Sequence, residues 1–243
     1  MYDQIAELYH LIFEDWETSI EWQAKRLDKK IAKTWGGRVS SVLDVSCGIG
    51  TQAIGLAQSG YEVQGCDLSS DSVRRARVEA ANRGLNIPFS VCDMRTLESF
   101  HGQSFDLVMT CDNALPHLLN DADILRALKQ MLHCLRPGGG LLLTIRDYAA
   151  TEVDKSEFHS YGIRCHAGQR YVVFQTRQYD GDYYDVALYF VRESDPPIVH
   201  VGRSRYYAIK HDRVSELMQE AGFVDVARCD EAYYHPVLTA SRP

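Results

Sequence analysis

The sequence lacks the cysteine and histidine spacings that are typical of a disulfide framework or a structural metal site. It has seven cysteines, an odd number, and no two of them form a CxxC pair. Its nine histidines include no HxxxH or HExxH pair. We therefore expect reduced thiols in a cytoplasmic protein, and no metal site.

Long apolar runs and an excess of basic charge are also missing. No apolar stretch approaches the roughly 20 residues that a membrane-spanning helix needs. The first residues, MYDQIAELYH, are acidic and amphipathic, unlike a signal or transit peptide. The formal net charge of -7 gives no general attraction for a phosphate backbone. These features disfavour membranes and nucleic acid as partners; they leave the oligomeric state open.

The order of predicted elements indicates an α/β fold. Between residues 41 and 147, short apolar strands alternate with helical patterns, which predicts a doubly wound, mostly parallel sheet. After Tyr148 the pattern changes to three strands, within residues 170–209, with no helix between them. We expect a single domain, 1–243, with an antiparallel insertion at 149–209 that caps a substrate pocket. Helical periodicity before residue 37 predicts an N-terminal lid over 1–37.

A glycine turn follows the first predicted strand, in the segment LDVSCGIGTQA. Gly48 and Gly50 allow unusual backbone angles and let a ligand approach the main chain. With Ala53 they also fit the G-x-G-x-x-A fingerprint of dinucleotide sites, so an NAD(P)-dependent oxidoreductase is one alternative.

Three acidic residues favour a different cofactor. Asp44 lies in the first strand, while Asp67 and Asp93 end the second and third strands. Asp67 suits ribose hydroxyls in either kind of site. Asp93 could accept a hydrogen bond from an adenine amino group, with Met94 against the ring. A carboxylate at Asp44 suits a cationic ligand such as S-adenosylmethionine (SAM), whereas it would repel the pyrophosphate of NAD.

The ordered motifs DVSCGIGT, CDLS, VCDMR, FDLVMTCDNALPHL and LRPGG resemble those of class I SAM-dependent methyltransferases. The resemblance implies a Rossmann-like, seven-stranded sheet whose last strand is antiparallel. It also implies the residues that contact SAM: Asp44, Ser46, Gly48 and Gly50 around the methionine part, Asp67 and Leu68 at the ribose, Asp93 and Met94 at the adenine, and Cys111 and His117 near the sulfonium and the adenosyl edge. Ser46 departs from the family's usual alanine or glycine.

The nature of the acceptor is less constrained. The Asp/Asn-Pro-Pro-aromatic clamp of nucleic-acid amine methyltransferases is absent, which favours a small molecule. CDNALPHL and IRDY resemble segments of glycine and sarcosine N-methyltransferases. That resemblance implies substrate contacts at Asn113, Arg146 and Tyr148, with Arg146 gripping a carboxylate. Asp147 departs from the usual asparagine and could instead pair with Arg146. O-methylation of a small hydroxylated compound and a catalytically silent SAM-binding protein stay open.

No catalytic triad is present, and methyl transfer from a sulfonium mainly needs alignment of the acceptor and exclusion of water. Tyr9 and His117 are the candidate catalytic residues. Tyr9 and Trp16, in YHLIFEDWETS, are candidates to close over SAM, although both could simply pack on the sheet.

Overall fold

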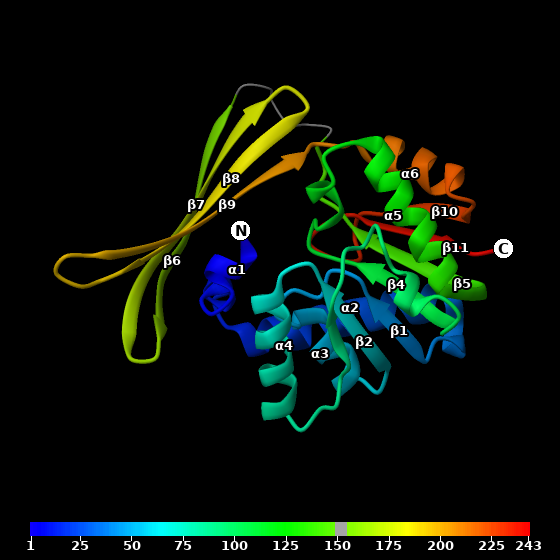
Figure 1. Ribbon diagram of the computed structural model, residues 1–243, viewed down its shortest axis with the longest axis horizontal. Helices are drawn as coiled ribbons and strands as arrows, with labels where there is room; N and C mark the ends of the chain where they lie inside the picture. The colour runs from blue at the N-terminus through cyan, green and yellow to red at the C-terminus, as the bar shows by residue number, and fades with distance from the viewer. Residues whose placement is uncertain (149–154) are drawn as a thin grey trace.

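The computed structural model describes residues 1–148 and 155–243. A main body with a seven-stranded sheet carries a second, four-stranded sheet that projects from it as a long twisted ribbon (Figure 1). The expected insertion at 149–209 begins with residues that lie outside the described ranges, and its described part forms the projecting sheet.

The main sheet is built from seven strands: β1 Ser41–Asp44, β2 Glu62–Asp67, β3 Phe89–Val91, β4 Phe105–Thr110, β5 Leu135–Thr144, β10 Val224–Cys229 and β11 Val237–Ser241. The projecting sheet has four: β6 Ser156–His166, β7 Gln169–Asp180, β8 Tyr183–Arg192 and β9 Ile198–Tyr207. The α-helices are α1 Tyr2–Ile5, α2 Trp16–Trp35, α3 Thr51–Gln58, α4 Ser70–Asn82, α5 Asp121–Cys134 and α6 His211–Glu220. Short 3-10 helices are η1 Tyr9–Ile12, η2 Gly36–Arg38, η3 Glu98–Phe100 and η4 Leu115–His117.

The main sheet has the strand order β10-β11-β5-β4-β1-β2-β3. β1 to β5 are parallel to one another, and β11 runs antiparallel to β5. The predicted doubly wound sheet with an antiparallel closing strand is confirmed. The strand order reverses between β1 and β4, which in open α/β sheets places a ligand crevice at the carboxyl ends of these strands.

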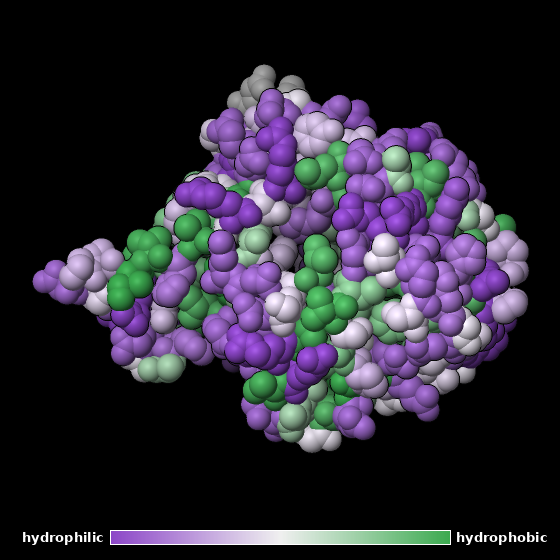
Figure 2. All heavy atoms as spheres, in the orientation of Figure 1, coloured by the Kyte–Doolittle hydropathy of each residue, from purple (hydrophilic) through white to green (hydrophobic). Residues whose placement is uncertain are grey.

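The projecting sheet has one strand more than the sequence predicted. β6 was missed because its side chains are exposed or half-buried on both faces, so they show no apolar alternation. β7 and β8 form a hairpin, with Asp180 paired to Tyr183 around Gly181, whose φ is +57°. Figure 2 shows hydrophobic atoms gathered on this projecting part, where Phe158 and Ile163 are exposed.

The N-terminal region has two parts with different surroundings. α1 and η1 lie between the body and the projecting sheet (Figure 1). α2 begins after Asp15, whose carboxylate accepts a 2.6 Å hydrogen bond from Thr18 N, and buries Ile20, Leu27 and Ile31 in the core of the body. The helical region predicted before residue 37 is therefore interrupted, and its longer helix, α2, belongs to the core. No helix in the described ranges is long and apolar enough to span a membrane.

A close approach between α2 and α3 depends on Gly55. A Cβ added there would lie 2.7 Å from Ala24 Cβ and 2.9 Å from the backbone oxygen of Ile20. Both distances are shorter than van der Waals contact. A side chain at residue 55 would therefore push the two helices apart.

We predict that Gly55→Ala lowers the free energy of unfolding by about 1–3 kcal/mol, because the cost of overpacking exceeds alanine's better helix propensity. Urea denaturation monitored by circular dichroism measures the change. Gly37→Ala is the control, since Gly37 has nothing within 4 Å of an added Cβ and no positive φ. Equal stability of the two variants would contradict this account of helix packing.

Candidate cofactor and acceptor site

A cavity of about 560 Å³ lies at the carboxyl ends of β1 to β4. It collects nine of the residues predicted from the sequence: Tyr9, Ser46, Gly48, Asp67, Leu68, Asp93, Met94, Cys111 and His117. The six other predicted residues do not line it: Trp16, Asp44, Gly50, Asn113, Arg146 and Tyr148. The first set forms the wall of the cavity, and the second set lies behind or beside that wall.

The glycine turn exposes its backbone to the cavity at Gly48. Gly48 has a φ of +51° and nothing within 4 Å of an added Cβ, and its N–H donates a 2.9 Å hydrogen bond to Asp67 Oδ2. Gly50 differs, because its φ is +96° and an added Cβ would meet Ile54 Cδ1 at 3.0 Å. Gly50 therefore serves the left-handed start of α3 and its packing and does not line the cavity, and its contact with a ligand stays a prediction.

Asp44 lies beneath the cavity floor and is fully buried. Its Oδ1 accepts a hydrogen bond from Ser46 N at 3.1 Å, while its Oδ2 has no partner within the part of the chain that the structure describes. Burial raises the pKa of Asp44 to about 8, and repulsion from Asp67 and Asp112 adds to the effect. A buried oxygen without a donor, beside two other carboxylates, favours a cationic ligand.

Asp67 and Leu68 follow β2 at the cavity wall. The Asp67 carboxylate is held from both sides, by Gly48 N and by Ser69 N at 2.8 Å, and burial raises its pKa. Leu68 is 68% exposed although it lines the cavity, which leaves an aliphatic surface for a ligand to cover. Ser46 is fixed on the other side by a 2.6 Å hydrogen bond with Thr110 Oγ1.

The residues after β3 include a carboxylate that already has a partner within the protein, which the sequence did not indicate. Asp93 and Met94 line the cavity, but the Asp93 carboxylate also binds Arg95, with a 2.6 Å contact to Nη2. The Arg95 guanidinium, which bonds Asp123 as well, lowers the pKa of Asp93. A ligand amino group would therefore share this carboxylate with an arginine of the protein.

Asp112 is a cavity residue that the sequence analysis missed. It follows β4 with a φ of +56°, and Asn113 follows it with a φ of +63°. Consecutive left-handed residues other than glycine are rare and tend to occur at functional sites. The Asp112 carboxylate accepts hydrogen bonds from Gln52 Nε2, at 2.6 Å, and from the hydroxyls of Tyr233 and Tyr234. An acidic residue directly after a buried strand at this edge was the signal that could have found it.

His117 is fixed between two hydroxyl groups at the opposite side of the cavity. Its Nε2 lies 3.0 Å from Tyr2 Oη and its Nδ1 lies 3.0 Å from Ser204 Oγ. Burial lowers the pKa of His117 to about 4, so the ring is neutral at pH 7.

Two further predicted residues lie at the cavity. Tyr9 packs edge-on against Tyr2, with 5.5 Å between the ring centroids. Cys111 also lines the cavity, and burial raises the pKa of its thiol, which suits a packing role.

Trp16 does not reach the cavity. It is buried, and its indole N–H donates a 2.9 Å hydrogen bond to Thr51 Oγ1. Thr51 itself lines the cavity. Trp16 thus reaches the cavity wall through Thr51, and its predicted contact with the cofactor stays a prediction.

The three predicted acceptor residues form one cluster beside the cavity, between the main sheet and the projecting sheet. The Asn113 side chain accepts from Arg146 N at 3.0 Å and bonds the hydroxyls of Tyr148 and Tyr184. Arg146 has no hydrogen-bond or ion-pair partner for its guanidinium among residues 1–148 and 155–243. Asp147 Oδ2 instead accepts from Arg228 Nη2 at 2.8 Å.

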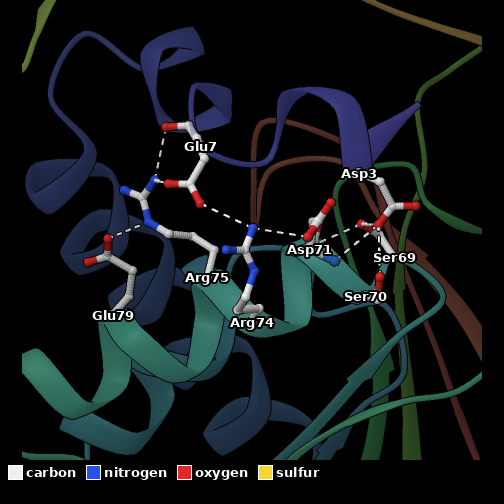
Figure 3. A network of polar contacts seen from close by, with 9 residues as sticks. Asp3, Glu7, Ser69, Ser70, Asp71, Arg74, Arg75 and Glu79 are labelled. Atoms are coloured by element: carbon white, nitrogen blue, oxygen red, sulfur yellow. Dashed lines mark hydrogen bonds and ion pairs between the residues drawn. The ribbon is translucent and has the colours of Figure 1, made fainter.

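The N-terminal segment is attached to the start of α4. Asp3 Oδ1 accepts hydrogen bonds from Ser69 Oγ at 2.8 Å and from Asp71 N at 3.0 Å (Figure 3). Further along, Arg75 Nη1 donates to the backbone oxygen of Glu7 at 2.9 Å. Because Ser69 also contacts Asp67, these bonds connect the segment that carries Tyr2 and Tyr9 to the wall of the cavity.

Comparison with known proteins agrees with this geometry. Residues 42–139 match a model described as a methyltransferase domain. The chain is 28% identical to a glycine/sarcosine N-methyltransferase of Parasynechococcus marenigrum (strain WH8102), over 92% of this chain and 78% of that protein. It is 35% identical to a ubiquinone biosynthesis O-methyltransferase of Azoarcus sp. (strain BH72), over 42% of each chain. It spans about half the length of several other curated relatives that it matches.

A solved structure shares the whole fold. SAM-bound CalS10, an amino pentose methyltransferase from Micromonospora echinaspora, superposes with a TM-score of 0.78 at 18% identity, over 97% of this chain and 94% of that one. The matches are thus to methyltransferases, over residues 42–139 for the domain model and over most of the chain for the glycine/sarcosine N-methyltransferase, and SAM-bound CalS10 has the same fold.

We predict that Asp3→Ala loosens residues 1–12 from the body, because it removes the acceptor that fixes them to the start of α4. The loss of a helix cap of this kind costs roughly 0.5–2 kcal/mol. Hydrogen–deuterium exchange should become faster in residues 1–12 and stay unchanged in α2. Asp15→Ala, which removes the local cap of α2, is the matched control and should have the reverse pattern. Unchanged exchange in residues 1–12 of Asp3→Ala would show that other contacts hold the segment.

Proposed function

We propose that this chain transfers the methyl group of SAM to the amine nitrogen of a small acceptor that carries a carboxylate. The observation that carries the proposal is the state of Arg146. Its guanidinium stands at the carboxyl end of β5 without an ion-pair partner among the described residues, while the carboxylates that could have neutralised it are bonded elsewhere, Asp147 to Arg228 and Asp112 to Gln52 and two tyrosines. A guanidinium can hold a carboxylate through two parallel hydrogen bonds.

The residues of the cavity fit the cofactor. Three carboxylates, Asp44, Asp67 and Asp112, act on one another in a buried space, and a ligand with cationic groups relieves their repulsion. The open backbone at Gly48 gives room for the methionine part, and Leu68 and Met94 offer apolar surface to the nucleoside. When bound, SAM supplies a methyl group on a positively charged sulfur, which is already activated for displacement.

The acceptor is held by residues outside the cofactor cavity. Asn113 fixes the backbone of Arg146 and the hydroxyls of Tyr148 and Tyr184, so the guanidinium has a supported position. Both ring nitrogens of neutral His117 bond the hydroxyls of Tyr2 and Ser204, so His117 acts on the acceptor side by orienting these two hydroxyls. Tyr9 and Tyr2 exclude water from the space between the two sites.

The two flanking segments have separate roles in this proposal. Within the predicted lid 1–37, residues 1–12 cover the cavity, and α2 is part of the body. The described part of the insertion, together with Tyr184, Ser204 and Tyr206, roofs the acceptor. The ubiquinone O-methyltransferase relative keeps a hydroxylated acceptor as the competing outcome of the acceptor test.

The raised pKa of Asp44 gives a prediction for cofactor binding. With a pKa of about 8, Asp44 is mostly protonated at pH 7 in the free protein, and a cationic ligand favours its ionised form. SAM binding should therefore release up to about one proton, so the affinity rises with pH and levels off above about pH 8. Calorimetry in two buffers of different ionisation enthalpy counts the protons.

Asp44→Asn should bind SAM more weakly and lose this proton release, whereas Asp71→Asn, on the exposed start of α4, should keep both. S-adenosylhomocysteine, which lacks the sulfonium charge, should release fewer protons than SAM. Proton release by Asp44→Asn equal to that of the unaltered protein would place the titration on another group.

We predict that Arg146→Lys raises the KM for amino-acid acceptors about 10- to 100-fold, because lysine keeps the charge but loses the two-pronged contact. The affinity for SAM and the melting temperature should change little, since Arg146 supports no described ion pair. The measurement compares glycine, sarcosine and a catechol as acceptors. Methylation of the catechol alone, with no effect of Arg146→Lys, would replace the carboxylate-bearing amine with a hydroxylated acceptor.

A further inference from the structure

Arg177 is a charged residue on the inner face of the projecting sheet. The strand register aligns it with Glu157 on β6 and with Val186 on β8, and Val186 is aligned with Ser204 on β9. Neighbouring rows of the same face carry Tyr179, Tyr184 and Tyr206, which pack into the main core. A guanidinium in such a face costs free energy unless it has partners or a ligand.

The side chain of Arg177 is held in place from one side. It is 16% exposed, and Nη1 donates to Glu157 Oε2 at 3.0 Å. One orientation of the Gln175 amide gives hydrogen bonds to both its oxygen and its nitrogen. In that orientation the oxygen accepts from Arg177 Nε at 3.1 Å and from Arg177 Nη2, and the nitrogen donates to Tyr161 Oη at 3.0 Å. A guanidinium has five N–H donors, so two remain available.

Arg177 and Arg146 face the same groups from opposite layers. Tyr184 links them, because its hydroxyl accepts from Asn113, which also bonds Arg146 N, and it lies in the row next to Arg177 on the same face of the sheet. Both arginines also act electrostatically on Tyr161, Tyr184 and His235. His235 shows the consequence, because burial and the charges of the two arginines together lower its pKa to about 4. Two cations thus converge on one region, and Glu157, at the rim and 32% exposed, is the one acidic partner that the described residues give Arg177.

We propose that Arg177 is the second cation of the acceptor's carboxylate subsite, and that it reaches the carboxylate from the projecting sheet while Arg146 reaches it from β5. The inference rests on the proposed function and adds a binding residue that the sequence did not indicate. The row that contains Arg177 ends at Ser204, the hydrogen-bond partner of His117. An acid held by Arg177 therefore lies on the face that also borders the cofactor cavity.

A carboxylate shared by the two arginines connects two layers that are also joined by tyrosine contacts and by the hydrogen bond between Ser204 and His117. Its binding aligns the projecting sheet with the end of β5, so the acceptor completes its own site. Acceptors without an acidic group lack this effect, so substitution of Arg177 should leave their KM unchanged.

The kinetic test compares glycine with glycinamide, which has the same amine and no carboxylate. Arg177→Gln should raise the KM for glycine about 10- to 100-fold and leave glycinamide, kcat and SAM affinity nearly unchanged. Arg177→Lys should recover part of the loss. The matched control is Arg205→Gln, because Arg205 lies on the outer face of the same sheet in exposed pairs with Asp180 and Asp185. If Arg146→Lys raises the glycine KM and Arg177→Gln acts no differently from Arg205→Gln, the proposed function stands and the role of Arg177 is refuted.

A binding test decides the matter independently of turnover. Acetate, as the carboxylate probe, should raise the pKa of His235 measured by NMR on histidine-labelled protein, with the resonance assigned through its loss in His235→Asn. The rise should be present in the unaltered protein and absent in Arg177→Gln and Arg146→Gln. A rise without methylation of any amino acid would support the subsite and refute the proposed reaction. No rise in the unaltered protein would refute the subsite.

Discussion

The crowding of carboxylates at the carboxyl edge of the main sheet is the constraint on which the site depends. Asp44, Asp67 and Asp112 each follow or end a parallel strand, so the sheet brings them together whatever their mutual repulsion. The protein offsets part of this cost with backbone N–H groups at Ser46, Gly48 and Ser69 and with the amide of Gln52. The unsatisfied oxygen of Asp44 shows that the compensation is incomplete. Such a site gains more from a cationic ligand than from a neutral one, which is consistent with SAM as the cofactor.

The segment proposed to cover the cavity is hydrogen-bonded to the same group of carboxylates at the edge of the sheet. Asp3 bonds Ser69, which in turn bonds Asp67, so the N-terminal segment is anchored at the residue proposed to hold the ribose. From there Tyr2 reaches both His117 and Tyr206 of the projecting sheet. A change at the cofactor wall can therefore reach the acceptor side through a short series of hydrogen bonds. This arrangement explains why residues 1–12 and the projecting sheet lie on one side of the body, over the strand ends.

Much of the fold and of the cofactor site followed from the sequence because parallel sheets have local signals. Apolar strands, glycine turns and an acidic residue after each strand predicted the edge at which Gly48, Asp67 and Asp93 meet. Features that depend on distant contacts did not follow. β6 has no apolar alternation, so periodicity could not reveal it. Trp16 and Gly50 had suitable sequence positions, but tertiary packing turned them toward Thr51 and Ile54. Asp112 and Arg177 acquire their surroundings from the C-terminal loop and from strand register, which no local pattern encodes.

The charges around the site divide into two poles, and this division orients the acceptor in the proposed reaction. The acidic pole holds Asp44, Asp67 and Asp112, and the basic pole holds Arg146 and Arg177, whose charges, together with burial, lower the pKa of His235 to about 4. Methyl transfer moves a positive charge from sulfur to the acceptor nitrogen. If the nitrogen faced the arginines, the new charge would form against two cations and raise the barrier. With the carboxylate toward the arginines and the nitrogen toward the acidic pole, the charge forms where the field favours it. In the proposed reaction, the same two poles would therefore select the acceptor, set its direction and stabilise the product of the transfer.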